Sequence, residues 1–169
     1  MVSLNIPPLM HGAAQWGALR FLFEGGTVVF VPRFSAEAVW SLVESEGVNT
    51  MMITGDAMAR PLIETLQEDP NRWDLSSLVL ITSSGVMWSE PVKHALLAHH
   101  PGMLLIDVFS SSEAIGLGQS ISAAGAESHT AKFSLGPSSR VISDEGRDVV
   151  PGSGEKGRVA VRGFTPIGY

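Results

Sequence analysis

Short apolar runs alternate with helical segments between residues 11 and 108, and this alternation constrains the fold more than any other feature. Four runs rich in β-branched and apolar residues are typical of short buried strands: residues 27–31, 50–54, 78–82 and 103–108. Four helices are predicted between them, from their apolar spacing and end signals: residues 11–23, 35–47, 58–66 and 89–100. Alternation of this kind favours a parallel sheet that is flanked by helices and connected by right-handed crossovers.

The pattern changes after about residue 120. Residues 140–143 and 158–162 read as short strands with alternating side chains, and turn signals rich in glycine lie between them. We therefore predict an α/β fold in two parts. Residues 1–121 form a helix-flanked, mostly parallel sheet, and residues 122–169 begin a small antiparallel β subdomain that is truncated at its C-terminus.

Composition and charge limit which partners and which environment this chain can have. The formal net charge of −6 argues against nucleic acid, for which a basic patch is expected. The chain has no cysteine, which excludes disulfides and thiolate metal sites within it, and we expect a cytoplasmic location. No apolar run reaches the ~18 residues of a membrane-spanning helix. The mean hydropathy of +0.21 is high for this length, so we expect apolar surface that promotes self-association of the isolated chain.

Residues 104–116 carry the clearest chemical signal. An apolar run ends in Ser110, Ser111 and Ser112, and the carboxylate of Glu113 follows directly. Ligands of open α/β sheets bind at the carboxyl ends of the strands, where these side chains are predicted to lie. Hydroxyls can hold phosphate oxygens, and a carboxylate can hold Mg²⁺ bound to the same phosphates. Taken alone, the cluster also suits a solvated turn.

Four blocks in order along the chain carry a resemblance to a known family: residues 7–12 (PPLMHG), 82–87 (TSSGVM), 107–113 (DVFSSSE) and 154–163 (GEKGRVAVRG). In this order and spacing they resemble the adenylate-forming superfamily, in particular the fatty acyl-CoA synthetases, over nearly the whole chain. The resemblance implies an AMP-forming acid–thiol ligase, which converts a carboxylate and ATP into acyl-AMP and then transfers the acyl group to CoA. It also implies ATP, Mg²⁺ and CoA as cofactors, and a fatty or other carboxylic acid as substrate.

The resemblance assigns roles on the nucleotide side. Ser112 takes the place of the hydroxyl residue that contacts the ATP phosphates, and Glu113 takes the place of the Mg²⁺ ligand, so these two are the catalytic candidates. Phe109 matches the aromatic residue that stacks on adenine. The other nucleotide-binding candidates share the two blocks at the predicted strand ends: Ser84, Gly85, Val86, Asp107, Val108, Ser110 and Ser111.

On the acyl side, His11 matches the histidine at the mouth of the acyl pocket, and Trp16 is a candidate for lining the acyl tunnel, although core packing would also suit it. Gly85 and Ser110 complete the acyl-binding candidates. The family usually has glycine at the position of Ser110 and alanine at that of Val86, so these larger side chains either reshape the pocket or simply pack.

Several segments of the family have no counterpart in this sequence. They are the phosphate loop, the Thr-Gly-Asp segment that holds the ribose, and the C-terminal domain with its adenylation lysine. We therefore expect an internal slice of a longer enzyme that is inactive, or nearly so, in isolation. Two alternatives stay open: a non-catalytic module that binds acyl chains or nucleotide or acts as a scaffold, and an aryl-CoA ligase or other adenylating enzyme of the same superfamily.

Overall fold

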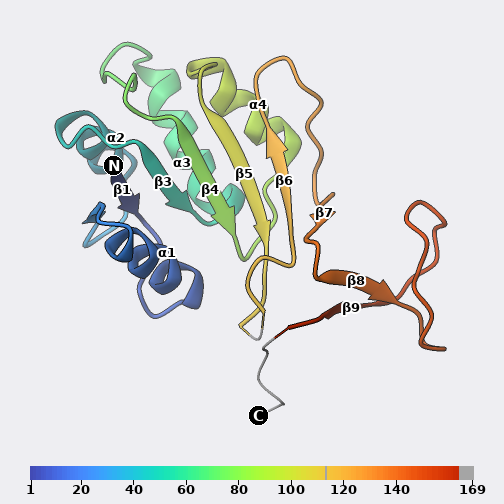
Figure 1. Ribbon diagram of the computed structural model, residues 1–169. Coiled ribbons are helices and arrows are strands. Elements are labelled where there is room, and N and C mark those ends of the chain that lie inside the picture. The colour runs from blue at the N-terminus through green and yellow to red at the C-terminus, as the bar shows by residue number, and fades with distance from the viewer. Residues whose placement is uncertain (113, 164–169) are drawn as a thin grey trace.

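The computed structural model describes residues 1–112 and 114–163, and within them seven strands form one sheet in the order β2-β1-β3-β4-β5-β6-β7 (Figure 1). The strands are β1 (Val2–Asn5), β2 (Thr27–Phe30), β3 (Thr50–Ile53), β4 (Leu80–Ser84), β5 (Leu104–Phe109), β6 (Gly118–Ser122) and β7 (Ser134–Leu135). The first five pair in parallel, whereas β6 and β7 are antiparallel to their neighbours. The predicted mostly parallel α/β sheet is confirmed.

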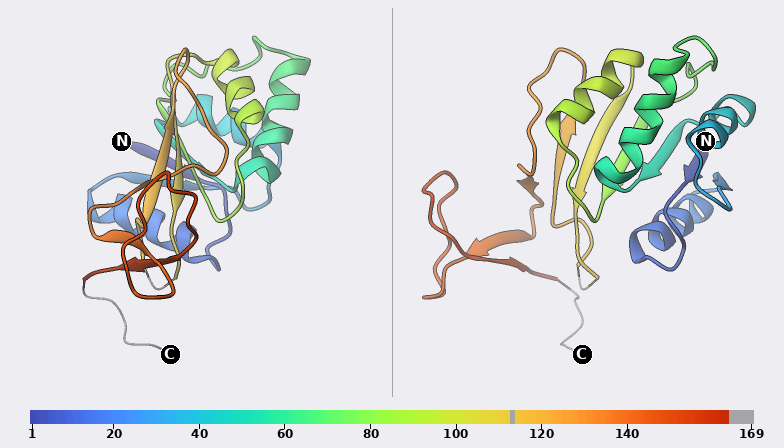
Figure 2. Two further views of the ribbon diagram at one scale, coloured as in Figure 1. Left: turned by 90° about the vertical axis from the view of Figure 1, so that its right-hand side faces the viewer. Right: turned by 180° about the vertical axis from the view of Figure 1, so that it is seen from behind.

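Helices cover both faces of this sheet, but unequally (Figure 2). Three helices pack on one face: α2 (Ala36–Ser45), α3 (Gly55–Glu68) and α4 (Glu90–His99). The main hydrophobic core lies beneath them, and Trp40, Leu62 and Leu96 are fully buried there. The helix α1 (Gly12–Phe23) lies on the opposite face, where Asn5 Nδ2 of β1 donates a hydrogen bond of 2.7 Å to the carbonyl of Ala14.

Three strands, β1, β6 and β7, and one helix start were not predicted. The strands β1 and β6 contain polar residues, and their short sequences show no apolar run, although β6 pairs along nearly the whole length of β5. The helix α3 begins at Gly55, three residues before the predicted start at Met58. The expected division between residues 121 and 122 falls within β6, before its last residue, and β7, which lies beyond the division, still belongs to the main sheet.

A second, two-stranded antiparallel sheet joins β8 (Ser139–Ile142) to β9 (Arg158–Val161), which confirms the predicted small β element. Exposed ion pairs link this sheet and its connecting loops, such as the pair between Arg158 and Asp144 at 2.7 Å. Exposed pairs of this kind contribute little to stability. None of the helices in the two described ranges is long and apolar enough to cross a lipid bilayer.

Candidate functional site

The carboxyl ends of β4 and β5 bring two of the sequence blocks side by side. The strands pair in parallel with Ser84 opposite Val108, and Ser84 Oγ donates a hydrogen bond of 3.0 Å to the Val108 carbonyl. The loop that follows β4 and the turn that follows β5 therefore leave the sheet at the same edge. This is the edge at which open α/β sheets bind ligands.

A pocket of about 320 Å³ opens between these two segments. Its lining contains six of the nucleotide-site candidates together with three further residues: Gly85, Val86, Met87, Asp107, Val108, Phe109, Ser110, Ala131 and Phe133. The rings of Phe109 and Phe133 lie 5.5 Å apart between centroids, with 33° between their planes. We call this cavity the nucleotide-side pocket. Phe133 belongs to none of the four sequence blocks and was not predicted as a site residue.

The serines after β5 build a tight turn. Ser110 Oγ accepts a hydrogen bond of 2.9 Å from the Gly116 N–H, and Ser111 Oγ accepts one of 3.2 Å from the Ala114 N–H. These two hydroxyls are therefore engaged within the turn, whereas Ser112 at its tip is exposed. Glu113, the expected Mg²⁺ ligand, lies outside the described residues.

The acyl-side candidates line two further cavities. One, of about 430 Å³, is lined by His11 together with Met52, Met58 and part of the loop after β4. The other, of about 230 Å³, runs between α1 and the sheet. Its lining includes candidates from both faces of the cavity and apolar neighbours: Trp16, Met52, Ser84, Val108, Ser110 and Ile115. We call these two cavities the mouth pocket and the α1 groove.

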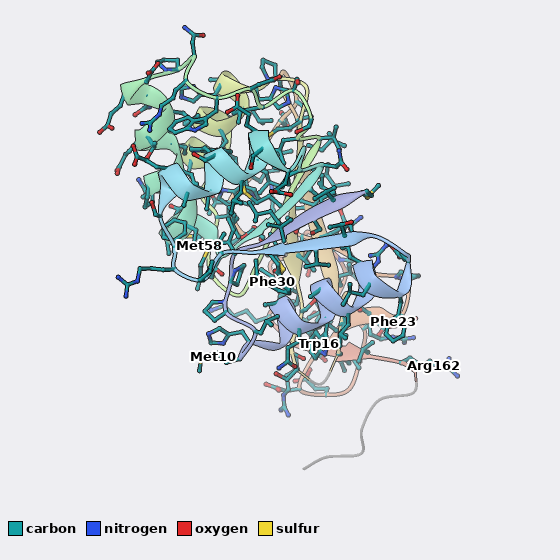
Figure 3. All side chains as sticks on the ribbon, turned by 90° about the vertical axis from the view of Figure 1, so that its left-hand side faces the viewer. Met10, Trp16, Phe23, Phe30, Met58 and Arg162 are labelled. Carbon is teal, nitrogen blue, oxygen red and sulfur yellow. The ribbon has the colours of Figure 1, made fainter. Side chains whose placement is uncertain are left out.

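Trp16 lies in the α1 groove, half-buried, and does not belong to the core cluster. Figure 3 labels it within α1, with Met10 just ahead of the helix and Phe23 at its end. Phe23 is 88% exposed, so the same helix presents one aromatic side chain to a cavity and another to solvent.

Gly85 and Val86 line both the nucleotide-side pocket and the mouth pocket. The loop after β4 is thus a wall that the two cavities share. An arrangement of this kind can bring two different ligands together at one place, with the loop backbone between them.

Asp56, in the first turn of α3, holds this shared wall. Its carboxylate accepts hydrogen bonds from the Ser89 N–H at 2.8 Å and the Ser89 hydroxyl at 2.7 Å, and it pairs with Arg60 at 2.8 Å. Burial raises the pKa of Asp56, but these hydrogen bonds and the Arg60 charge outweigh it and leave the pKa below its ordinary value. The preceding residue, Gly55, donates its N–H to Ser83 Oγ at 2.8 Å. Acidic residues are common at the start of helices, so the sequence alone does not identify Asp56 as a residue that supports the site.

Asp107 belongs to the lining of the nucleotide-side pocket, but its carboxylate is paired with Lys93 of α4. Its Oδ2 is 3.6 Å from the Nζ of Lys93, and the exposed fractions of the two side chains are 5% and 1%. Burial raises the pKa of Asp107, and the neighbouring ammonium of Lys93 opposes that rise. Asp107 was predicted as a site residue from its sequence block, whereas Lys93 was not.

The described residues contain no cluster of side chains that would bind a metal ion by itself. Among residues 1–112 and 114–163, no three His, Cys, Asp or Glu side chains are grouped so that they could hold a metal ion. A single carboxylate together with phosphate oxygens remains the type of donor set that suits Mg²⁺.

Comparison with known proteins shows what the chain is similar to. The family model described as "AMP-binding enzyme" matches residues 1–166. A medium/long-chain-fatty-acid–CoA/3-oxocholest-4-en-26-oate–CoA ligase of Mycolicibacterium smegmatis is 40% identical over 174 residues, covering all of this chain and 31% of that protein. A 3-oxocholest-4-en-26-oate–CoA ligase of Rhodococcus rhodochrous is 38% identical over 177 residues, again with 100% and 31% coverage. The chain thus spans about a third of the length of these relatives.

Among solved structures, a long-chain-fatty-acid-CoA ligase from Archaeoglobus fulgidus superposes with a TM-score of 0.75 at 18% identity. The superposition covers 96% of this chain and 34% of that one. At this identity the match concerns the fold.

Proposed function

The chain belongs to the AMP-binding enzyme family, and on that premise we propose that it supplies part of the adenylate-forming site of an acyl-CoA ligase. One observation carries the proposal: the nucleotide-side pocket and the mouth pocket share the wall formed by Gly85 and Val86. Joining an acid to AMP requires the two ligands to meet, and proximity of this kind is a large part of catalysis.

The reaction proposed for the whole enzyme has two steps. A carboxylate oxygen of the acid attacks the α-phosphorus of ATP, the bond to the bridging oxygen of pyrophosphate breaks, and acyl-AMP is formed. The thiol of CoA then attacks the acyl carbon, and AMP leaves. The first step concentrates negative charge on the phosphates, which needs cationic or hydrogen-bonding stabilisation.

On the nucleotide side, we assign the adenine ring to the space beside Phe109 and Phe133, because aromatic rings at this spacing offer a stacking surface. The exposed hydroxyl of Ser112 is assigned to the phosphates. Glu113 is assigned to Mg²⁺, whose charge would neutralise the phosphates. Five further candidates line and shape this pocket: Gly85, Val86, Asp107, Val108 and Ser110. Ser84 and Ser111 lie outside its lining, and we assign them to holding the end of β4 and the turn after β5 through their hydroxyl hydrogen bonds.

On the acyl side, we assign the carboxylate end of the acid to the mouth pocket at His11 and its apolar body to the α1 groove along Trp16. Gly85 and Ser110 border these cavities. Their mostly apolar lining favours a fatty or steroid acid over an amino acid, whose ammonium would need an acidic partner. We also propose the division of the chain into two parts, residues 1–121 and 122–169. We further propose a cytoplasmic location, where ATP and CoA are available.

Calorimetric titration of the chain with Mg-ATP tests the nucleotide half of the proposal. We expect measurable binding that weakens by about tenfold in Glu113→Ala, since a charge-assisted contact is lost. The matched control is Glu64→Ala, an exposed carboxylate on α3 that lines none of the three cavities described above. Equal affinity of the Glu113→Ala and Glu64→Ala variants, or no binding by the unaltered chain, would count against the proposal.

A panel of ligands separates the acid classes. Dodecanoate, a steroid side-chain acid, an aryl acid and an amino acid are titrated in the presence of Mg-ATP, and pyrophosphate release is followed in parallel. Preferential binding of the fatty or steroid acid supports the acyl assignment, whereas a preference for the aryl or amino acid contradicts it. Pyrophosphate release by the isolated chain would contradict the expectation that it is inactive, and binding without release is the result expected both for an incomplete ligase and for a binding module.

A further inference from the structure

Lys93 is a buried ammonium that the proposed reaction does not use. It lies in α4, and its side chain is 1% exposed. A buried charge is costly unless it is paired and hydrogen-bonded. Lys93 meets this requirement with three partners from three different segments.

The partners of Lys93 surround the nucleotide-side pocket. Its Nζ is 3.6 Å from the carboxylate of Asp107 at the end of β5, and it lies 5.6 Å from the ring centroid of Trp88 in the loop after β4. It also donates a hydrogen bond of 3.2 Å to the carbonyl of His129, in the segment that follows β6. One side chain therefore connects α4 to every segment that forms this pocket.

Among the described residues, one further hydrogen bond joins the segment after β6, residues 123–133, to α4, and another contact joins it to β6. The hydroxyl of Thr130 accepts a hydrogen bond of 2.8 Å from the Glu90 N–H, and the hydroxyls of Ser122 and Ser128 lie 2.9 Å apart. Beyond these contacts the chain turns sharply at Ala131, a non-glycine residue with φ of +54°, and then reaches Phe133. Ala131 and Phe133 both line the nucleotide-side pocket.

We propose that Lys93 is a positioning residue of the nucleotide-side pocket, which holds residues 128–133 against α4 so that Phe133 faces Phe109. The same ammonium draws the Asp107 carboxylate toward α4. This inference rests on the proposed function for the meaning of the pocket, but the placement of the segment is a property of the chain alone.

Amide hydrogen exchange tests the placement. The first variant is Lys93→Met, which keeps the aliphatic stem and removes the charge. Because it leaves the Asp107 carboxylate buried without its partner, a second variant, Lys93→Met with Asp107→Leu, removes both charges. Replacing a buried pair by apolar residues is often neutral or stabilising, so the double variant is expected to fold. The control is Leu96→Ala, which opens a cavity in the core from the same helix, at a residue that does not line the pocket.

We expect amides of residues 128–133 to exchange about tenfold faster in both Lys93 variants, since a hydrogen bond to a charged donor is lost. Other amides of the double variant should keep their protection. In Leu96→Ala, protection should fall without preference for this segment. Exchange in residues 128–133 that matches the rest of the chain in the double variant overturns the proposal.

Titration with Mg-ATP separates this inference from the proposed function. If Lys93→Met binds Mg-ATP about tenfold more weakly than Leu96→Ala, as expected for a lost charged contact, both proposals are supported. If all proteins bind equally while the segment loosens, Lys93 places the segment but the segment does not serve the nucleotide, and the positioning role is refuted. If the unaltered chain does not bind, the proposed function fails, and exchange alone decides the placement.

Discussion

The wall between the two pockets depends on Gly55, and replacing Gly55 with alanine should displace it. Gly55 has φ of +44°, a conformation that costs an alanine about 1–2 kcal/mol. A Cβ at this position would also collide with the Met87 carbonyl oxygen and lie 2.7 Å from Val86 Cγ2. The first of these atoms belongs to the backbone of the loop, so rotation of a side chain cannot relieve the contact.

The magnitude follows from adding the two effects. Overpacking of a well-packed site typically costs about 1–3 kcal/mol, which raises the expected loss of unfolding free energy for Gly55→Ala to roughly 2–5 kcal/mol. Gly47→Ala is the matched control, because Gly47 has φ of +58° and a Cβ added there would meet no atom within 4 Å. It should lose only the conformational part, about 1–2 kcal/mol.

Urea denaturation of the unaltered chain, Gly55→Ala and Gly47→Ala gives their unfolding free energies. The difference between the two variants measures the cost of the collision with the loop. Hydrogen exchange should in addition show lower protection of residues 85–89 in Gly55→Ala and unchanged protection there in Gly47→Ala. Equal unfolding free energies for the two alanine variants would refute the reasoning, because the loop would then have room for the added carbon.

Three further substitutions test single contacts. Asp56→Asn removes a carboxylate whose pKa is lowered despite its burial. The ionised Asp56 carboxylate therefore stabilises the fold at pH values above the ordinary aspartate pKa, and this stabilisation is lost as the pH falls through the lowered pKa of Asp56. The unfolding free energies of the variant and the unaltered chain should therefore differ at pH 7 and converge below about pH 4; a constant difference contradicts this. Ser110→Ala leaves the Gly116 N–H without its acceptor and should cost about 1 kcal/mol in urea denaturation, and an unchanged value would show that the turn holds without it. Trp16→Ala should weaken dodecanoate binding by about tenfold through lost apolar contact, whereas the exposed Phe23→Ala should not; equal effects would remove the acid from the α1 groove.

The parts of the fold that the sequence predicts are those with a local signal. The strands β3 and β5 are mostly apolar because both of their faces are covered or partly covered, so each appears as a short run in the sequence. The run predicted at residues 78–82 overlaps β4, which begins two residues later, at Leu80, and ends in Thr-Ser-Ser. The strand β6 is Gly-Gln-Ser-Ile-Ser, and it forms because its backbone pairs with the edge of β5. Pairing of this kind depends on a partner and leaves no apolar pattern in the strand itself.

The same distinction applies to the site. The blocks containing Gly85 and Phe109 follow neighbouring parallel strands, so topology alone brings them to one edge. Phe133 lines the pocket beside Phe109, and Lys93 lies behind the lining, where it contacts Asp107 and His129. These partners are far away in sequence. A lysine in the middle of an amphipathic helix is normally exposed, so only the structure identifies this one as buried.

The shared wall predicts how the effects of substitutions on the two ligands are coupled. Asp56 and Gly55 hold the loop after β4 from α3, and that loop borders both the nucleotide-side pocket and the mouth pocket. A substitution that moves the wall should therefore weaken Mg-ATP and acid binding together. Trp16 borders only the α1 groove among the three cavities, so its substitution should weaken acid binding alone. Joint loss in Gly55→Ala and selective loss in Trp16→Ala would mean that the backbone between the ligands, and not either lining separately, sets the distance at which they meet.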